Sequence, residues 1–355
     1  MTADARPESQ QDQPRRKVVL FGELMMRLST KRHERIVQAR EFDVSYSGAE
    51  ANSGVALVGY GIDSYIVSGV PDNAVGDACL AYLRQFSLNL DFVKRIGHRL
   101  GIYFVETGAA QRPSTFLYNR KGSSITELRP GDLDWDEILA GKDWFHVTGI
   151  TPALADSVAE ITKEACAAAR RHGLMVSLDL NFRRRLWSPE KARQVLTGLM
   201  EDVTVLFTNE EEAATIFGIE AQGADVRGGK LEERGYEEVA AKLHERLNLK
   251  YVSITLRESL SATANNWSGV LYDGTTIYRS PTYHIDYIVD RVGGGDAHSA
   301  GIMYGLLTGK GPQWTVDFAA AASCLKHSIP GDFNLVSFDE VLALMQGDGS
   351  GRIQR

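Results

Sequence analysis

Short, almost continuously apolar runs recur along most of the chain. They lie at residues 17–22, 64–69, 144–149, 175–181, 203–209 and 251–256. Runs of this length and composition are typical of parallel strands that are buried on both faces. We therefore interpret these segments as strands of one central sheet.

Helical patterns fill the stretches between these runs. Residues 158–168 carry apolar side chains at helical spacing, and Gly173 is suited to end that helix. Ser337 and Glu340 form a capping-box sequence before an apolar segment. Strands that alternate with helices predict an α/β fold in which a mainly parallel sheet lies between two helical layers.

Two stretches break this alternation. Residues 27–46 and 101–120 contain strand-like pieces with no helix after them. We expect these pieces to form a small β-sheet that covers the main domain as a lid. The polar, Gly-rich residues 219–235 are predicted to be a surface loop.

The two ends of the chain differ in composition from its middle. Residues 1–16 are predicted to be a disordered tail, and residues 347–355 a loose C-terminal tail. Residues 17–346 then form one α/β domain with its lid. Because the first residues hold no apolar signal segment and no run approaches the ~18 apolar residues of a membrane helix, we expect a cytoplasmic protein with no membrane partner.

The charge balance narrows the class of partner. The formal net charge is −7 and the pI is about 5.7. This balance argues against nucleic acid as the main partner, because nucleic-acid-binding proteins normally carry a basic excess. It does not argue against an anionic small molecule, since a local arginine cluster can lie in an acidic protein.

The strongest chemical feature is a glycine-rich turn within residues 289–301. A strand-like segment runs into Gly293, Gly294 and Gly295, and a helical pattern follows. Glycines allow backbone N–H groups to converge, and the helix start adds its positive dipole end, so the turn is suited to bind a phosphate. Asp296 follows directly, where a base would take the proton of a hydroxyl that attacks the phosphate. The alternative is a plain turn in which Asp296 caps the helix.

This turn resembles the second signature, Gly-Ala-Gly-Asp, of the ribokinase-like (PfkB) sugar kinases, with Gly294 in place of alanine. Residues 47–61 resemble the first signature of that family, a glycine-rich strand-to-helix turn that holds the sugar. The resemblance implies a ribokinase-like three-layer fold in which Gly48 and Asn52 bind the substrate. A helix entry with a buried amide is the alternative for these two residues.

A third segment, Asn209 to Glu212, resembles the family's Asn-x-x-Glu motif. The resemblance implies that Asn209 helps to bind the nucleotide and that Glu212 acts on Mg²⁺ through water. The segment follows an apolar run, which places it at the carboxyl end of a strand, where open α/β sheets bind ligands. The alternative is a charged, solvated helix start.

The expected adenosine segment departs from the family pattern. Residues 255–260 contain no glycine, whereas many members carry Gly-x-x-Gly there. Thr255 and Arg257 are the nucleotide-binding candidates that remain, with Arg257 expected near the phosphates or the ribose. Arg291 replaces a more common threonine and is expected to offset charge on the moving phosphoryl group.

Within the family the chain most resembles 2-keto-3-deoxygluconate kinases, in residues 22–28, 101–103, 118–123, 179–183 and 329–332. Tyr103 and Tyr118 can hydrogen-bond sugar hydroxyls, and Asp332 can accept a hydroxyl proton. Arg120 and Arg183 are suited to two-point binding of a carboxylate. Because a neutral sugar needs no arginine pair, this pair indicates a sugar acid. A surface salt bridge is the alternative for each arginine.

We therefore expect Mg·ATP-dependent phosphorylation of the terminal hydroxyl of a small sugar acid, with 2-keto-3-deoxygluconate as the first candidate. ATP and Mg²⁺ are the expected cofactors, and the protein is expected to be a homo-oligomer. The alternatives are another ketose, a nucleoside or an epimeric sugar acid as substrate, or a non-catalytic sugar-acid sensor on the same fold. Asp296 argues against the sensor, because binding alone needs no base, whereas the altered segment at Arg257 favours it.

Overall fold

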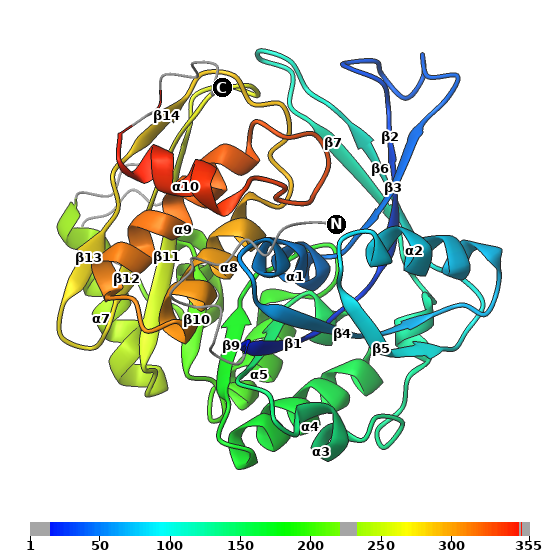
Figure 1. Ribbon diagram of the computed structural model, residues 1–355, viewed down its shortest axis with the longest axis horizontal. Coiled ribbons are helices and arrows are strands. Elements are labelled where there is room, and N and C mark those ends of the chain that lie inside the picture. Colours follow the sequence, from blue (N-terminus) through cyan, green and yellow to red (C-terminus); the bar gives the residue numbers. More distant parts are fainter. Residues whose placement is uncertain (1–14, 221–232, 348, 350–355) are drawn as a thin grey trace.

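A ten-stranded sheet forms the centre of the protein (Figure 1). The computed structural model describes residues 15–220, 233–347 and 349. From edge to edge the strands follow the order β13 (Ile277–Arg279), β12 (Asn265–Tyr272), β11 (Tyr251–Ser259), β10 (Val205–Thr208), β9 (Met175–Asp179), β8 (Trp144–Thr148), β1 (Lys17–Phe21), β4 (Asp63–Val70) and β5 (Asn89–Arg95), and β14 (Tyr283–Ile285) pairs with β12. The pairings from β11 to β5 are parallel, and those of β12 are antiparallel.

The predicted strands are confirmed. Strand β1 shows why their sequences are continuously apolar. Val18 and Leu20 pack into the core on one face of the sheet, while Val19 and Phe21 pack into the core on the other face. All four side chains are fully buried. A parallel strand that is covered on both faces cannot alternate apolar with polar residues, so its sequence is continuously apolar.

Helices cover both faces of this sheet, as predicted. One core contains side chains of α3 (Trp135–Leu139), α4 (Asp156–Arg171), α5 (Pro189–Leu199) and α7 (Glu233–Leu247). The other contains side chains of α1 (Ala49–Gly59), α2 (Ala74–Arg84), α8 (Gly294–Leu307), α9 (Pro312–Lys326) and α10 (Phe338–Met345). The local signals hold as well: Gly173 has a φ of 74° just after α4, and the capping box between Ser337 and Glu340 is present.

The predicted small sheet is also present, and Figure 1 shows it at the upper right, beside the main sheet. Its four strands follow the order β3 (Asp43–Ser47), β2 (Met25–Ser29), β6 (Gly101–Glu106) and β7 (Thr115–Asn119). Both stretches that broke the helix–strand alternation therefore contribute two strands each. We call these four strands the lid sheet.

The predictions for the ends and the polar loop fall partly on residues outside the described part of the chain. Residues 1–14, 221–232, 348 and 350–355 lie outside the described part. The loop prediction is wrong at its last three residues, because α7 begins at Glu233. Gly235 suggested a loop, but it lies in the first turn of the helix, where a helix tolerates glycine better than in its interior. Within the described ranges, no helix has both the length and the apolar composition needed to cross a membrane.

Candidate active site

The three glycines at the start of α8 have different surroundings. Gly293 has a φ of 83°, and a Cβ atom there would collide with the carbonyl oxygen of Asp332. A Cβ atom on Gly294 would come 2.9 Å from the ring of His327. A Cβ atom on Gly295 would meet no atom within 4 Å. Two glycines are thus required for packing, and the third leaves open space at the start of a helix, where N–H groups lack intrahelical partners.

Asp296 lies in the first turn of α8 and is held by α1, which packs beside it (Figure 1). The side-chain amide of Asn52 donates a hydrogen bond of 2.7 Å to its carboxylate, and the Ser53 hydroxyl donates to its backbone oxygen at 3.1 Å. Burial raises the pKa of Asp296 to about 7, against the lowering effect of the Asn52 hydrogen bond. A buried carboxyl group with a pKa near neutrality is suited to act as a general base.

Gly48 also has a packing reason. It precedes α1, and a Cβ atom on it would collide with the backbone oxygen of Glu23. The close approach of these two segments sets where α1 begins and hence where Asn52 meets Asp296. The structure therefore brings Asn52 and Asp296 into direct contact, whereas Gly48 acts on that contact through the backbone.

Tyr103 and Asp332 form a buried pair between the lid sheet and the main domain. The Tyr103 hydroxyl donates to Asp332 Oδ2 at 2.5 Å and lies 2.8 Å from the hydroxyl of Ser47. Tyr118, on the neighbouring strand, stacks on Tyr103 with ring centroids 5.6 Å apart and is 44% exposed. Tyr103 is therefore the buried, hydrogen-bonded member of this stack, and Tyr118 is the exposed member.

Arg120 forms an ion pair with Glu23. Its Nε donates to the Glu23 carboxylate at 2.8 Å, and Ser123 also donates to Glu23, which is buried. The guanidinium group also lies 5.4 Å from the ring centre of Tyr118. Its positive charge is therefore largely neutralised within the protein.

Arg183 lies in a different setting. It follows β9, is exposed, and forms no ion pair with any residue in the described ranges. Its charge lowers the pKa of Asp296 and of Glu212, which places it near both carboxylates. Of the two arginines predicted to hold a carboxylate, Arg183 alone forms no direct ion pair within the described ranges, and no hydrogen bond joins it to Arg120 there.

Arg27 is a site residue to which the sequence reasoning assigned no role. Its side chain is 3% exposed and pairs with Asp332 and, at 2.5 Å, with Asp290. Arg27 belongs to β2 of the lid sheet, so it joins the lid to the segment that leads into the glycine turn. The available signal was one arginine inside the apolar strand MMRLS, since a buried arginine needs an acidic partner.

A pair of carboxylates lies where β9 and β10 end. Asn209 caps the short helix α6 (Glu210–Glu212), and Glu212 accepts a hydrogen bond of 2.9 Å from the backbone of Phe182. Burial raises the pKa of both Asp179 and Glu212, and the charge of Glu212 raises the pKa of Asp179 further. Asp179, which was not among the predicted site residues, is thus a close neighbour of Glu212. Carboxylate oxygens suit a hard cation such as Mg²⁺.

The described residues contain no group of three or more His, Cys, Asp or Glu side chains arranged to hold a metal ion alone. Two neighbouring carboxylates fit a cation whose remaining ligands are water or phosphate oxygens, which is the usual situation of Mg²⁺.

Two arginines border the glycine turn on the side of β11. Arg257 is exposed, on the strand that also carries Thr255. Arg291 donates to the backbone oxygen of Ala262 at 2.6 Å. Burial lowers the pKa of Arg291, and the charge of Arg257 lowers it further, so the two cations are neighbours. Two like charges next to an anion-binding turn are suited to a polyanion such as a triphosphate.

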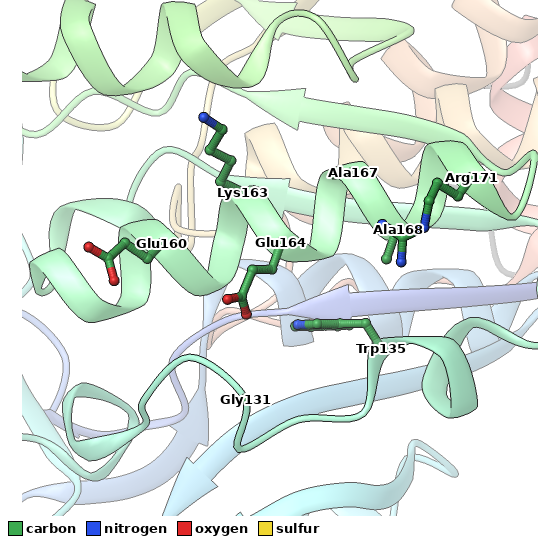
Figure 2. A pocket seen from close by; sticks show the side chains of 8 residues that line it. All are labelled: Gly131, Trp135, Glu160, Lys163, Glu164, Ala167, Ala168 and Arg171. Carbon is green, nitrogen blue, oxygen red and sulfur yellow. The ribbon is translucent and has the colours of Figure 1, made fainter.

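A separate surface groove of about 670 Å³ lies between α3 and α4 (Figure 2). Trp135 and the α4 side chains Glu160, Lys163, Glu164 and Arg171 line it. None of these residues belongs to the Asp296 region. The groove therefore does not mark the catalytic centre.

Comparison with known proteins gives matches over nearly the whole chain. Residues 15–334 match the family described as pfkB family carbohydrate kinase. A 2-dehydro-3-deoxygalactonokinase of Haloferax volcanii is 30% identical over 334 residues, which cover 94% of this chain and 98% of that protein. A 2-dehydro-3-deoxygluconokinase of Thermoproteus tenax is 28% identical over 319 residues, 89% of each chain.

Solved structures agree with this result. The crystal structure of 2-dehydro-3-deoxygluconokinase from Thermotoga maritima matches with a TM-score of 0.90 and 45% sequence identity, and covers 94% of this chain and 100% of that one. The shared architecture is the mainly parallel sheet with a separate small sheet. The fold, the match over the chain and the predicted signatures point to one conclusion: this protein belongs to the pfkB family of carbohydrate kinases.

Proposed function

We propose that this kinase transfers the γ-phosphate of Mg·ATP to the terminal hydroxyl of a small sugar acid, and that the acid is 2-keto-3-deoxygluconate. The observation that carries the proposal is the position of Asp296, a buried carboxyl group with a pKa of about 7 beside the open space over Gly295. The names of the Haloferax and Thermotoga relatives, which act on 2-dehydro-3-deoxy sugar acids, support the substrate class.

In the proposed reaction Asp296 takes the proton of the sugar hydroxyl. At the same time the oxygen of that hydroxyl bonds to the γ-phosphorus. The bond from that phosphorus to the bridging oxygen breaks, and ADP leaves with the bonding electrons. Amides of the Gly293–Gly295 turn and the start of α8 stabilise the charge on the phosphoryl group. Arg257 and Arg291 bind the remaining phosphates, next to Thr255.

Mg²⁺, when bound, neutralises charge on the phosphate oxygens. Asp179 and Glu212 are the residues that would hold it, through water, and Asn209 fixes Glu212 by capping its helix. Phe182 donates its N–H to Glu212, so this carboxylate is already oriented in the protein.

The sugar acid is proposed to lie between the lid sheet and the start of α8. Arg183 binds its carboxylate, and Arg120 is a second, weaker group because Glu23 already neutralises it. Tyr118 offers its exposed side chain, while Tyr103 and Asp332 form the buried floor. The lid sheet excludes water from this space, which limits hydrolysis of ATP.

Replacing Arg183 with alanine tests the acid preference. A charge-assisted contact that only the acid can make is worth about 1.5–3 kcal/mol, so kcat/KM for the acid should fall roughly 10–100-fold. The value for the matching neutral sugar should change little. Arg184→Ala is the matched control, because Arg184 is an exposed neighbour that lies over the ring of Phe182. An equal loss for acid and neutral sugars would mean that Arg183 is structural.

The pH dependence of kcat/KM should report Asp296. Its raised pKa of about 7 means that the group is increasingly protonated, and unable to accept a proton, as the pH falls below that value. We expect kcat/KM to approach a tenfold loss per pH unit on the acidic side, and a plateau above it.

Asn52→Leu should move this acidic limb to higher pH. The amide of Asn52 donates to the carboxylate and favours its charged form, so its loss raises the pKa of Asp296 further. Asn89→Leu, on the edge strand β5, should leave the limb in place. A profile with no acidic limb between pH 5 and 8, or a limb that Asn52→Leu does not move, would contradict this assignment of the base.

A further inference from the structure

Lys326 is a fully buried lysine at the last position of α9. Its ammonium group donates to the backbone oxygen of Ile329 at 3.1 Å and to that of Asp290 at 3.3 Å. Within the described structure no carboxylate accepts a hydrogen bond from it. Burying a charged group is costly unless its surroundings compensate for it, so an ammonium in this position calls for a functional explanation.

The two carbonyl groups belong to the two segments that build the catalytic turn. Asp290 lies three residues before Gly293, and Ile329 lies three residues before Asp332. A Cβ atom on Gly293 would come 3.3 Å from Cε of Lys326. The lysine side chain therefore lies against the backbone of the anion cradle and joins both segments at one nitrogen atom.

Two nearby carboxylates offset part of the cost of burying the ammonium group. The carboxylates of Asp290 and Asp332 raise its pKa, although burial has the larger, opposite effect. Both carboxylates also pair with Arg27, so two acids face two cations. Asp290 further ties the segments together, since it accepts from Val292 N at 3.0 Å and from Gly331 N at 3.1 Å.

We propose that Lys326 is a positioning residue for phosphoryl transfer. Its ammonium group acts as a built-in cation that fixes the Asp290–Gly293 segment against the Ile329–Asp332 turn. The cradle amides and Asp332 then keep one relative position when the triphosphate arrives. The proposal concerns the kinase reaction of the family and does not depend on which sugar is the acceptor.

Lys326→Met removes the charge and keeps most of the volume of the side chain. Because a shift of about 1 Å in a catalytic group can cost about 10²-fold in rate, we expect kcat per folded molecule to fall roughly 10–100-fold. The loss is measured at saturating sugar, because Asp332 lies on the turn that Lys326 fixes and its displacement should also raise the sugar KM. Lys142→Met is the matched control: this partly buried lysine precedes β8 at the opposite end of the strands and lies 4.5 Å from the ring centre of Tyr65.

Chemical rescue by small ammonium ions distinguishes a positioning role of Lys326 from a role in stabilising the fold. Lys326→Ala leaves a space for a small ammonium ion, so methylammonium should restore kcat in a saturable way. Tetramethylammonium has no N–H donors and should not. The proposal is overturned if Lys326→Met keeps kcat within about twofold of the wild type, if the loss matches the unfolded fraction, or if both ions act alike.

The affinity for an ATP analogue tests the role of Lys326 without relying on the proposed sugar substrate. If the wild-type protein phosphorylates no sugar acid, the affinity for Mg²⁺ with a non-hydrolysable ATP analogue is measured by calorimetry instead. A displaced cradle should weaken binding in Lys326→Met about tenfold or more, and Lys142→Met should match the wild type. Unchanged affinity in Lys326→Met would overturn the role of Lys326, whatever the acceptor is.

Discussion

Asp296→Asn should lower kcat by roughly 10²–10⁴-fold, which is the usual contribution of a positioned general base. Asparagine has nearly the same shape, and its amide oxygen can still accept the hydrogen bond from Asn52. The helix start and the glycine turn should therefore stay in place. Affinities for ATP and the sugar should change little, because the substitution removes proton acceptance and leaves the anion cradle intact.

Single-turnover measurements by rapid quench give the rate of the chemical step directly. Asp339→Asn is the matched control, since Asp339 is also an acidic residue in the first turn of a helix, but it is exposed on α10. It should behave like the wild type. If Asp296→Asn retained more than about a tenth of the wild-type chemical rate, Asp296 would not be the base.

Gly295→Val should abolish measurable turnover while the protein remains folded. A Cβ atom on Gly295 meets no protein atom within 4 Å, and the residue needs no positive φ, so the valine side chain can be accommodated in the protein alone. The same side chain would fill the space in which the phosphoryl group must approach the backbone. Loss of this charge stabilisation should cost at least ~10²-fold in kcat.

Two other glycines make the Gly295 result interpretable. Gly198→Val on α5 also points into open space and should keep full activity. Gly293→Val should instead fail to fold stably, because of its φ of 83° and the collision with the Asp332 carbonyl oxygen. Circular dichroism gives the folded fraction, and calorimetry gives the ATP affinity. Normal rate and affinity in Gly295→Val would show that Gly295 serves only the turn.

The elements that the sequence predicted correctly are those that depend on local pattern. A parallel strand buried on both faces, such as β1, must be continuously apolar, and a capping box such as that at Ser337 is complete within four residues. The glycine turn before Asp296 is local in the same sense. The hydrogen bond between Asn52 and Asp296 was not predicted, because 244 positions separate the two residues and no local pattern links them.

The residues that sequence reasoning missed are charged groups whose partners lie far away in the chain. Arg27 and Asp332 are 305 positions apart, and Arg120 and Glu23 are 97 apart. A charged residue in an apolar segment indicates that the residue is buried and has a partner of opposite charge. The segment alone does not identify that partner. For this reason the sequence treated Arg120 and Arg183 as equivalent, although Glu23 neutralises only Arg120. The cytoplasmic location and the homo-oligomer stay predictions.

Phosphorylation of a sugar acid should be visible as ADP release from Mg·ATP in the presence of that acid. The panel contains 2-keto-3-deoxygluconate, 2-keto-3-deoxygalactonate, fructose, ribose and adenosine, and NMR locates the phosphate on the product. We predict ADP release with a keto-deoxy sugar acid, phosphate on its terminal hydroxyl, and kcat/KM at least ~10-fold above that for any neutral compound. The proposed function would be contradicted by turnover of a neutral sugar or nucleoside but of neither acid. It would also be contradicted if an acid bound without any ADP release.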